Sequence, residues 1–415
     1  MVINQTLSNG VRVVMEPIPY VQSAAVGIWV RAGSIDEAEN QKGISHFIEH
    51  MLFKGTEKRS ARQIAEDCDW IGAQVNAFTS KEATCYYMKV LASELQSACE
   101  ILTDMFMHSR FDPEEMEREK NVIYEEMKMS EDDPEDDAHD LLQERIFRGT
   151  SFESPVIGNR EALSAMKQRD LQEYLYNQYT ADHIVVSVAG NIDPDQVCAF
   201  FEKTLQGLKP SKTDVPFEKP EYRPEHFVKV KEVEQSHLCI GTQGVTLDSE
   251  LYYPYSVFSN LFGGSMSSRL FQKVREEKGL AYSVYSVSHS YSLLGIFSIY
   301  AGVAHDKVEE LLEALAEEFQ LLKKEPVSQR EMHMAKLQLK SSYTFNQENV
   351  NSRMFSIGRS TLLMNSVRSS EEVLGKIEAV SLQDIACVVD RLSDISGYSG
   401  VLVSRNDLDL KGWIK

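Results

Sequence analysis

The sequence predicts an α+β protein of two homologous domains, each an antiparallel-rich sheet with helices packed on one face. Three observations lead to this fold class. Strand-like segments precede helix-like segments in each half, sequence patterns of the first half recur in the second, and the stretch 209–224 has neither strand nor helix periodicity. The predicted organisation is a domain at 1–208, a linker at 209–224 and a homologous domain at 225–415.

The elements of the first half follow from residue spacing. Alternating apolar residues and β-branched runs predict half-buried strands, and apolar residues three or four positions apart predict helices. The predicted strands are 11–16, 24–32, 74–78 and 84–90, and the predicted helices contain 46–50, 61–71 and 95–106. The first helix is expected to end near Gly55, and Ser60 marks the start of the second.

The second half repeats this plan. The segment Leu163–Leu171 of the first half resembles Ile377–Ile385 of the second. Each segment precedes a helix and then an apolar, β-branched strand, at 184–189 and at 400–403. The two halves are therefore predicted to be copies of one unit.

The most informative motif is H-x-x-E-H, formed by His46, Glu49 and His50. The histidines are four residues apart on a predicted helix, so both imidazoles project from one face and can bind one metal ion. Glu49 lies on the flank of this face, where its carboxylate can take a proton from an activated water. The alternative is two histidines on an ordinary helix surface, and a third ligand would decide between them.

A second predicted helix supplies a candidate third ligand. Asp112 is its expected N-cap and Pro113 its first residue. At 100° per residue, Glu119 and Glu126 fall within the arc that carries its apolar residues. Those apolar residues are Met116, Val122, Ile123 and Met127. Carboxylates on a core-facing arc are costly unless paired or bound to metal, so Glu126 is predicted as the ligand and Glu119 as an acceptor that orients a ligating histidine.

The equivalent helix of the second half keeps its cap and its apolar arc but lacks these carboxylates. When the two helices are aligned on these shared features, Ala335 stands in place of Glu119 and Ser342 in place of Glu126. Because the second copy of the fold does without them, the two glutamates are predicted to serve a site and not the fold.

With these residues the chain resembles the pitrilysin/insulinase family of zinc metallopeptidases, the inverzincin class, in its short-chain, processing-peptidase-like bacterial branch. In that family H-x-x-E-H is followed about 75 residues later by a ligand glutamate, with another glutamate seven residues before it. The resemblance covers essentially the whole chain. It implies one Zn²⁺ per chain, held by His46, His50 and Glu126, with Glu49 as the catalytic base and Glu119 as the orienting acceptor.

The resemblance also implies substrate-binding residues. The segment 74–79 resembles the edge strand along which the family lays its substrate. The residues concerned are Asn76, Ala77 and Phe78. Arg275 and Tyr282 resemble the pair that holds the substrate main chain near the scissile bond, although a surface arginine and a core aromatic are the ordinary alternatives. The family encloses its substrate between two halves, often in a homodimer.

Composition narrows the remaining function classes. A net charge of −20 disfavours nucleic acid and anionic membranes; it favours basic peptides, or serves solubility alone. Six cysteines without C-x-x-C spacing are typical of free thiols in a reducing cytosol. The amino-terminal residues lack a signal-peptide pattern, and no apolar stretch approaches about 20 residues, so a cytoplasmic protein without a membrane span is expected.

The predicted function is a zinc-dependent endopeptidase acting on short or unfolded polypeptides enclosed between two facing halves. One alternative is a non-catalytic assembly subunit of the same fold, in which Glu49 would have no use. Another is a zinc hydrolase for a non-peptide bond, which would need a small preformed pocket in place of a strand edge.

Overall fold

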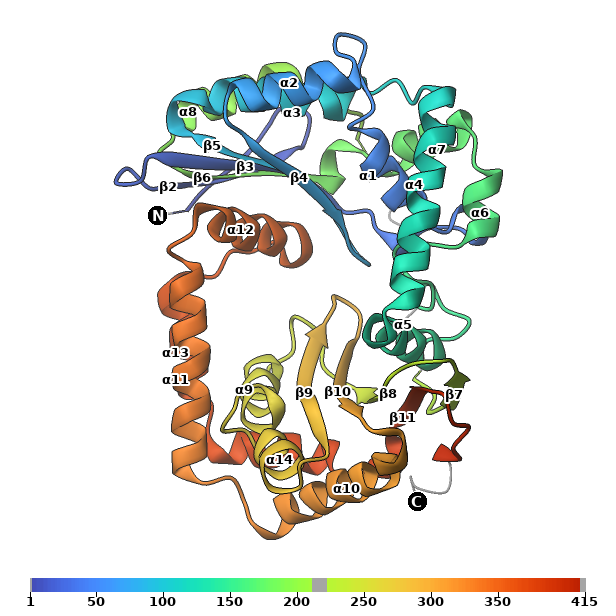
Figure 1. Ribbon diagram of the computed structural model, residues 1–415. Helices are drawn as coiled ribbons and strands as arrows, with labels where there is room; N and C mark the ends of the chain where they lie inside the picture. Colours follow the sequence, from blue (N-terminus) through green and yellow to red (C-terminus); the bar gives the residue numbers. More distant parts are fainter. Residues whose placement is uncertain (1, 211–221, 411–415) are drawn as a thin grey trace. The chain divides into compact units, whose positions relative to one another are not determined.

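The computed structural model describes residues 2–210 and 222–410, and the chain forms two compact units. The first unit takes Met1–Met127, Ser154–Phe217 and Thr344–Val367; the second takes Lys128–Glu153, Glu218–Tyr343 and Arg368–Lys415. The predicted α+β class with two related sheets is confirmed (Figure 1). The units differ from the predicted division of the chain, because each takes up a segment from the other half. The predicted linker, 209–224, lies largely outside the described residues.

A six-stranded sheet forms the centre of the first unit, in the order β1-β2-β6-β3-β5-β4. Its strands are β1 (Ile3–Thr6), β2 (Arg12–Pro17), β3 (Ser23–Val30), β4 (Gln74–Thr79), β5 (Thr84–Leu91) and β6 (Ile184–Gly190). Strands β2 and β6 pair in parallel, and the other neighbours pair antiparallel. Strand β4 ends the order, so one edge of it faces away from the described sheet and can accept a further strand.

Helices with apolar arcs cover one face of this sheet, where they bury a shared core. The helices of this part of the chain are α1 (Ile44–Met51), α2 (Ala61–Trp70), α3 (Leu95–His108), α4 (Pro113–Asp132), α6 (Arg160–Ala165), α7 (Gln168–Gln178) and α8 (Pro194–Thr204). Ser60 caps α2 with a capping box, as its position predicts. Helix α1 ends at Met51 and not near Gly55, because the chain closes into tight turns in which the amide of Phe53 bonds to His50 and that of Lys54 to Met51.

The second unit contains a five-stranded sheet in the order β7-β11-β8-β10-β9. Its elements are β7 (His226–Val230), β8 (Ser236–Gln243), α9 (Tyr252–Gly263), a π-helical turn η5 (Phe271–Glu277), β9 (Ala281–Ser290), β10 (Gly295–Val303), α10 (Val308–Lys324), α11 (Gln329–Asn346), α13 (Ser370–Ala379), α14 (Leu382–Leu392) and β11 (Ser399–Ser404). The order repeats β2-β6-β3-β5-β4 strand for strand, with its one parallel pair, β7 and β11, at the corresponding place. The two sheets are therefore copies of one topology.

Two equivalent helices are exchanged between the copies. Helix α12 (Val350–Met364), from the second half of the sequence, packs on β2, β3 and β6 of the first sheet (Figure 1). Helix α5 (Pro134–Ile146), from the first half, packs on β8 and β11 of the second sheet. Their first residues are separated by the same offset as Glu119 and Ala335, so the two helices are copies within the repeat. Each sheet therefore has helices on both faces, whereas the sequence predicted helices on one face.

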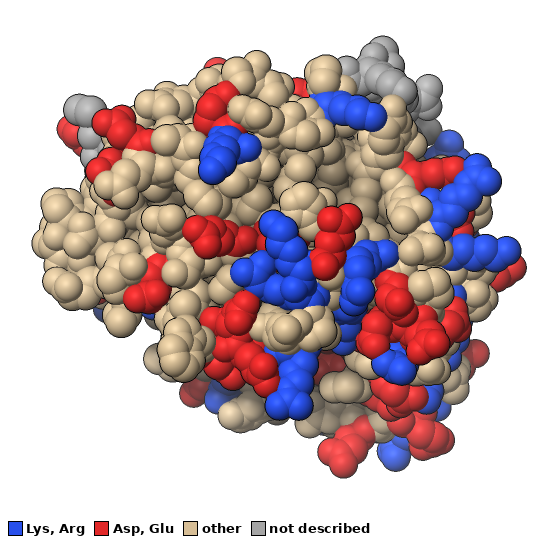
Figure 2. Space-filling view, turned by 90° about the horizontal axis from the view of Figure 1, so that it is seen from above, with Lys and Arg blue, Asp and Glu red and all other residues tan. Residues whose placement is uncertain are grey.

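Surface charge and cysteine burial can be compared with the composition. On the face shown in Figure 2, acidic and basic side chains lie interspersed beside a broad region in which charged residues are few, so this face presents no single acidic field. Five of the six cysteines are buried, and all six are free thiols; Cys387 is the exposed one. Within the described ranges, no helix has both the length and the apolar character of a membrane span.

Candidate metal centre

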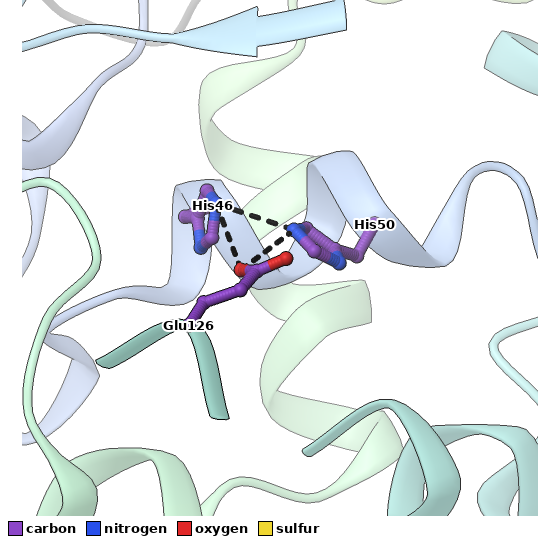
Figure 3. A group of neighbouring side chains, drawn as sticks. All are labelled: His46, His50 and Glu126. Atoms are coloured by element: carbon purple, nitrogen blue, oxygen red, sulfur yellow. Dashed lines mark hydrogen bonds and ion pairs between the residues drawn. The ribbon is translucent and has the colours of Figure 1, made fainter. Parts of the chain in front are cut away.

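The first unit brings three predicted ligands together from two helices. Helix α1 carries His46 and His50, and Glu126 reaches them from α4 (Figure 3). The two imidazole Nε2 atoms are 3.2 Å apart. The Oε2 atom of Glu126 lies 3.9 Å from the Nε2 of His46 and 3.5 Å from that of His50. In the described part of the chain, this is the group of potential metal ligands whose donor atoms converge, all within 4.8 Å of one another.

The donor set and its spacing fit a zinc ion. Two donors of a tetrahedral zinc site, with bonds of about 2.0–2.1 Å, lie about 3.3 Å apart. The observed separations of 3.2, 3.5 and 3.9 Å lie around that value. Two imidazoles and one carboxylate leave a fourth position for water, and the Glu126 side chain is 37% exposed, so this side of the site reaches solvent.

The two histidines have different surroundings. Burial, and then the neighbouring His50, lower the pKa of His46 to about 4, so its imidazole is neutral and can offer a lone pair. The Nδ1 atom of His46 is buried and has no hydrogen-bond partner among the described residues. The Nδ1 atom of His50 instead lies 2.8 Å from Oε1 of Glu119. Burial opposes the charged form of His50, but this hydrogen bond and the nearby carboxylates outweigh it and raise the pKa of His50.

Glu119 occupies the position predicted for an acceptor that orients a histidine. It is buried on α4 and contacts His50 through one oxygen and Lys54 through the other, with Nζ of Lys54 2.5 Å from Oε2. Burial favours the neutral acid, but these two partners outweigh it and lower the pKa of Glu119. Lys54 was missed in the sequence, because it follows the end of α1 and its partner lies on another helix.

Glu49 lies on α1 between the two histidines in sequence and contacts the end of β4. Its Oε2 atom accepts a hydrogen bond of 2.5 Å from the hydroxyl of Thr79. Burial raises the pKa of Glu49, and the charge of Glu126 adds to the effect, although the Thr79 hydrogen bond and His50 oppose it. A carboxyl group with a raised pKa is better matched to proton transfer near neutral pH. The role of Thr79 as a partner of Glu49 was also missed in the sequence.

The start of α1 is fixed by a buried carboxylate. Glu37 accepts hydrogen bonds from the amides of Gly43 and Ser45, at 2.7 and 2.9 Å. Gly43 has a φ of +90°, and a Cβ there would lie 2.6 Å from the carbonyl oxygen of Ile157, so only glycine fits this N-cap. Burial raises the pKa of Glu37 to about 7. This cap sets the position of the histidines that follow it.

The residues predicted to bind substrate main chain lie on β4. Asn76 is exposed, Ala77 is half-buried, and β4 ends the sheet. The ring of Phe78 packs edge-on against Trp29, at 5.6 Å between centroids, and against Phe355 of α12. The Phe78 side chain thus belongs to the core under α12, and in the sheet Phe78 is paired with Cys85 of β5.

Arg275 and Tyr282 lie together in the second unit. The Nη1 atom of Arg275 donates a hydrogen bond of 2.9 Å to the carbonyl oxygen of Tyr282, and its guanidinium group lies 4.5 Å from the centre of the Tyr282 ring. Tyr282 is 77% exposed, so the alternative of a core aromatic is wrong. The exposed Tyr282 and the half-buried Arg275 form a prearranged pair, which agrees with a binding role, and the role itself stays a prediction.

One pocket of the first unit is lined by other residues. It has a volume of about 810 Å³ and is lined by the chain around Ser93 at the start of α3 and around Asp193 at the start of α8. None of the predicted site residues lines it. The converging ligands and Glu49 therefore lie near the edge strand β4 and not in this pocket.

Two family descriptions match the chain: "Insulinase (Peptidase family M16)" over residues 12–160 and "Peptidase M16 inactive domain" over residues 165–339. "Uncharacterized zinc protease YmxG" of Bacillus subtilis (strain 168) is 44% identical over 385 residues, which cover 93% of this chain and 94% of that relative. An uncharacterized zinc protease of Mycobacterium tuberculosis (strain ATCC 25618 / H37Rv) is 36% identical over 392 residues, covering 93% of this chain and 90% of the relative.

Solved structures share the fold at low sequence identity. A crystal structure described as a peptidase M16 inactive domain from Pseudomonas fluorescens superimposes with a TM-score of 0.91 at 18% identity, covering 98% of this chain and 99% of that one. A protease from Helicobacter pylori gives a TM-score of 0.87 at 20% identity, covering 97% and 99%. Since one of these structures is called inactive, the fold alone does not decide whether a chain is an enzyme.

Proposed function

The chain belongs to the insulinase family of peptidases, family M16, and from this premise we propose that it is a zinc-dependent endopeptidase acting on short or unfolded polypeptides. The observation that carries the proposal is the convergence of His46, His50 and Glu126 on one point beside Glu49. Relatives that cover nearly the whole chain are named zinc proteases, which supports zinc as the metal.

In the proposed mechanism two histidines and one carboxylate bind the metal, and a second carboxylate transfers a proton. A zinc ion held by His46, His50 and Glu126 would supply Lewis-acid activation of water and of the peptide carbonyl. Glu49 accepts a proton from the attacking water and returns it to the leaving amine. Its raised pKa suits this exchange, and the hydroxyl of Thr79 holds the carboxylate in place.

The proposed substrate binds as an added strand beside β4. Strand β4 ends the described sheet, and its last residue, Thr79, contacts Glu49, so a main chain aligned along this edge would pass beside the proposed base. Binding through main-chain hydrogen bonds tolerates many side chains, which favours unfolded or short polypeptides over one fixed sequence.

A homodimer and a role for Arg275 and Tyr282 belong to the same proposal. Mixing two inactive variants tests both at once: Glu49→Gln removes the base, and Arg275→Ala removes the proposed main-chain clamp. If Arg275 serves the site of a partner chain, the mixture regains part of the parent activity. If it serves its own chain, the mixture gains no activity over the two variants measured separately.

The alternative is a non-catalytic subunit of the same fold. A subunit without activity would have no need for a half-buried carboxylate at this place, yet Thr79 holds Glu49 beside the converging ligands. The proposed endopeptidase is therefore favoured by the contact of Glu49 and not by the fold.

One experiment tests the proposal. The purified protein is incubated with a peptide mixture, with and without a zinc chelator, and the products are identified by mass spectrometry. Cleavage that stops with chelator and falls roughly 100-fold or more in Glu49→Gln supports it. Parent-level cleavage by Glu49→Gln, or no cleavage by the zinc-loaded parent, contradicts it.

A further inference from the structure

Lys54 contacts the carboxylate that orients one of the converging histidines. Its Nζ lies 2.5 Å from Oε2 of Glu119, while Oε1 of the same carboxylate lies 2.8 Å from Nδ1 of His50. The two oxygens of Glu119 are thus held by two partners that both come from the segment around α1. Glu119 itself comes from α4, the helix that also carries Glu126.

The backbone at Lys54 and at the next residue is also hydrogen-bonded. The amide of Lys54 donates to the carbonyl oxygen of Met51, and the carbonyl oxygen of the next residue, Gly55, accepts from the amide of Arg110 at 3.2 Å. The Lys54 side chain is 29% exposed, so its ammonium group is partly shielded from water. A charged group on such a fixed stem keeps one position relative to Glu119.

The buried carboxylate of Glu119 needs this cation. Its side chain is only 6% exposed, and a buried carboxylate is costly unless it is both hydrogen-bonded and paired with a positive charge. A histidine that offers its Nε2 lone pair to a metal is neutral and supplies a hydrogen bond but no charge. Lys54 supplies the charge, and its position lets the other oxygen of Glu119 face His50.

We propose that Lys54 is a positioning residue of the metal centre: it fixes Glu119, and through Glu119 it fixes the ring orientation of His50. This inference rests on the proposed function to the extent that the site holds zinc, but it does not require that the protein cleave peptides. In the described part of the chain, the Lys54 side chain contacts Glu119, and its effect reaches His50 through this carboxylate.

The chain offers a matched control for Lys54. Lys58 is exposed and lies on the same connection four residues later. Lys54→Met keeps the aliphatic stem and removes the charge, Lys54→Arg keeps a cation, and Lys58→Met removes a charge of the same sign from the same loop. The conservative variant separates loss of charge from loss of packing.

The test measures the zinc dissociation constant of each zinc-loaded variant by competition with a chelating dye. The visible spectrum of the cobalt-substituted protein reports ligand geometry. We expect Lys54→Met to weaken zinc binding roughly 10-fold and to change the cobalt spectrum, since groups that orient metal ligands contribute about 10–100-fold in affinity. Lys54→Arg should restore most of the affinity, and Lys58→Met should match the parent. In a Glu119→Gln background, Lys54→Met should have no further effect.

Three results would overturn the inference. The first is parent-like zinc affinity in Lys54→Met. The second is an equal loss of affinity in the Glu119→Gln background. The third is a lower thermal midpoint of the metal-free Lys54→Met protein without any change in the cobalt spectrum, which would assign Lys54 to the fold. A protein that binds zinc but cleaves no peptide would refute the proposed function and leave this inference standing.

Discussion

The hydroxyl of Thr79 donates a hydrogen bond of 2.5 Å to the carboxylate of Glu49. Thr79 is the last residue of β4, and Glu49 lies on α1, so this bond joins the edge of the sheet to the helix that carries both histidines. One side-chain contact therefore connects the proposed base with β4, the strand beside which the substrate is proposed to bind.

Removal of this hydroxyl should slow catalysis without releasing metal. In Thr79→Val, which keeps the side-chain volume, we expect kcat/KM to fall roughly 10-fold because Glu49 loses its fixed orientation. Steady-state peptide cleavage and zinc content measure the two effects separately. Thr79→Ser retains the hydroxyl and should behave like the parent. Parent kinetics in Thr79→Val would show that the contact does not position Glu49.

Glu126 should be required for metal, and its sequence neighbour should not. Glu126→Gln replaces the converging oxygen by an amide and is expected to weaken zinc binding roughly 100-fold or more, as loss of a ligand should exceed loss of a supporting group. Glu125→Gln changes an exposed residue of the same helix and should retain zinc. Zinc analysis after dialysis compares them, and full occupancy in Glu126→Gln would move the third ligand elsewhere.

The surroundings of two helix glycines predict that substitution by alanine has opposite effects on stability. Gly358 lies in the close contact between α12 and the first sheet, and Gly375 lies in open space. A Cβ on Gly358 would lie 2.2 Å from the indole nitrogen of Trp29, which bonds to Ser187. We expect Gly358→Ala to lower the free energy of unfolding by about 1–3 kcal/mol. Gly375 lies inside α13 with no atom within 4 Å of an added Cβ, so Gly375→Ala should raise it by about 0.5–1 kcal/mol. Urea unfolding measures both; equal effects would argue against the tight packing of α12.

Glu37 should make stability depend on pH below neutrality. Burial raises its pKa in the folded protein to about 7 from 4.5, so the folded state holds a proton that the unfolded chain has released. The contribution of Glu37 to the free energy of unfolding is therefore fully present below pH 4.5, and it is lost as the pH rises through about 7. The difference between parent and Glu37→Gln in free energy of unfolding, measured from pH 4.5 to 8, should follow this curve. A difference independent of pH would refute the assignment.

Local spacing predicted those features that lie on a single element. The four-residue spacing of His46 and His50 placed both on one face, and the arc of α4 pointed to Glu119 and Glu126. The prediction that Val122 faces the core was wrong. This residue lies at the margin of the apolar arc and is 46% exposed. Glu126 lies between Val122 and the buried Glu119 around the helix, which explains its partial exposure.

Contacts between distant segments left no such pattern. An amphipathic arc predicts that α12 packs on a sheet but does not state which sheet, so the exchange of α5 and α12 was not predicted. Thr79 and Lys54 reach Glu49 and Glu119 across the fold, and their partners could be found only from coordinates.

The proposed catalysis depends on one zinc ion held by His46, His50 and Glu126. Anomalous diffraction at the zinc absorption edge, from crystals of the zinc-loaded protein, tests this most directly. A single peak per chain, about 2.0–2.2 Å from the Nε2 atoms of both histidines and from a carboxylate oxygen of Glu126, is the predicted result. A peak at other residues, or no peak from a protein that still cleaves peptides, would contradict it.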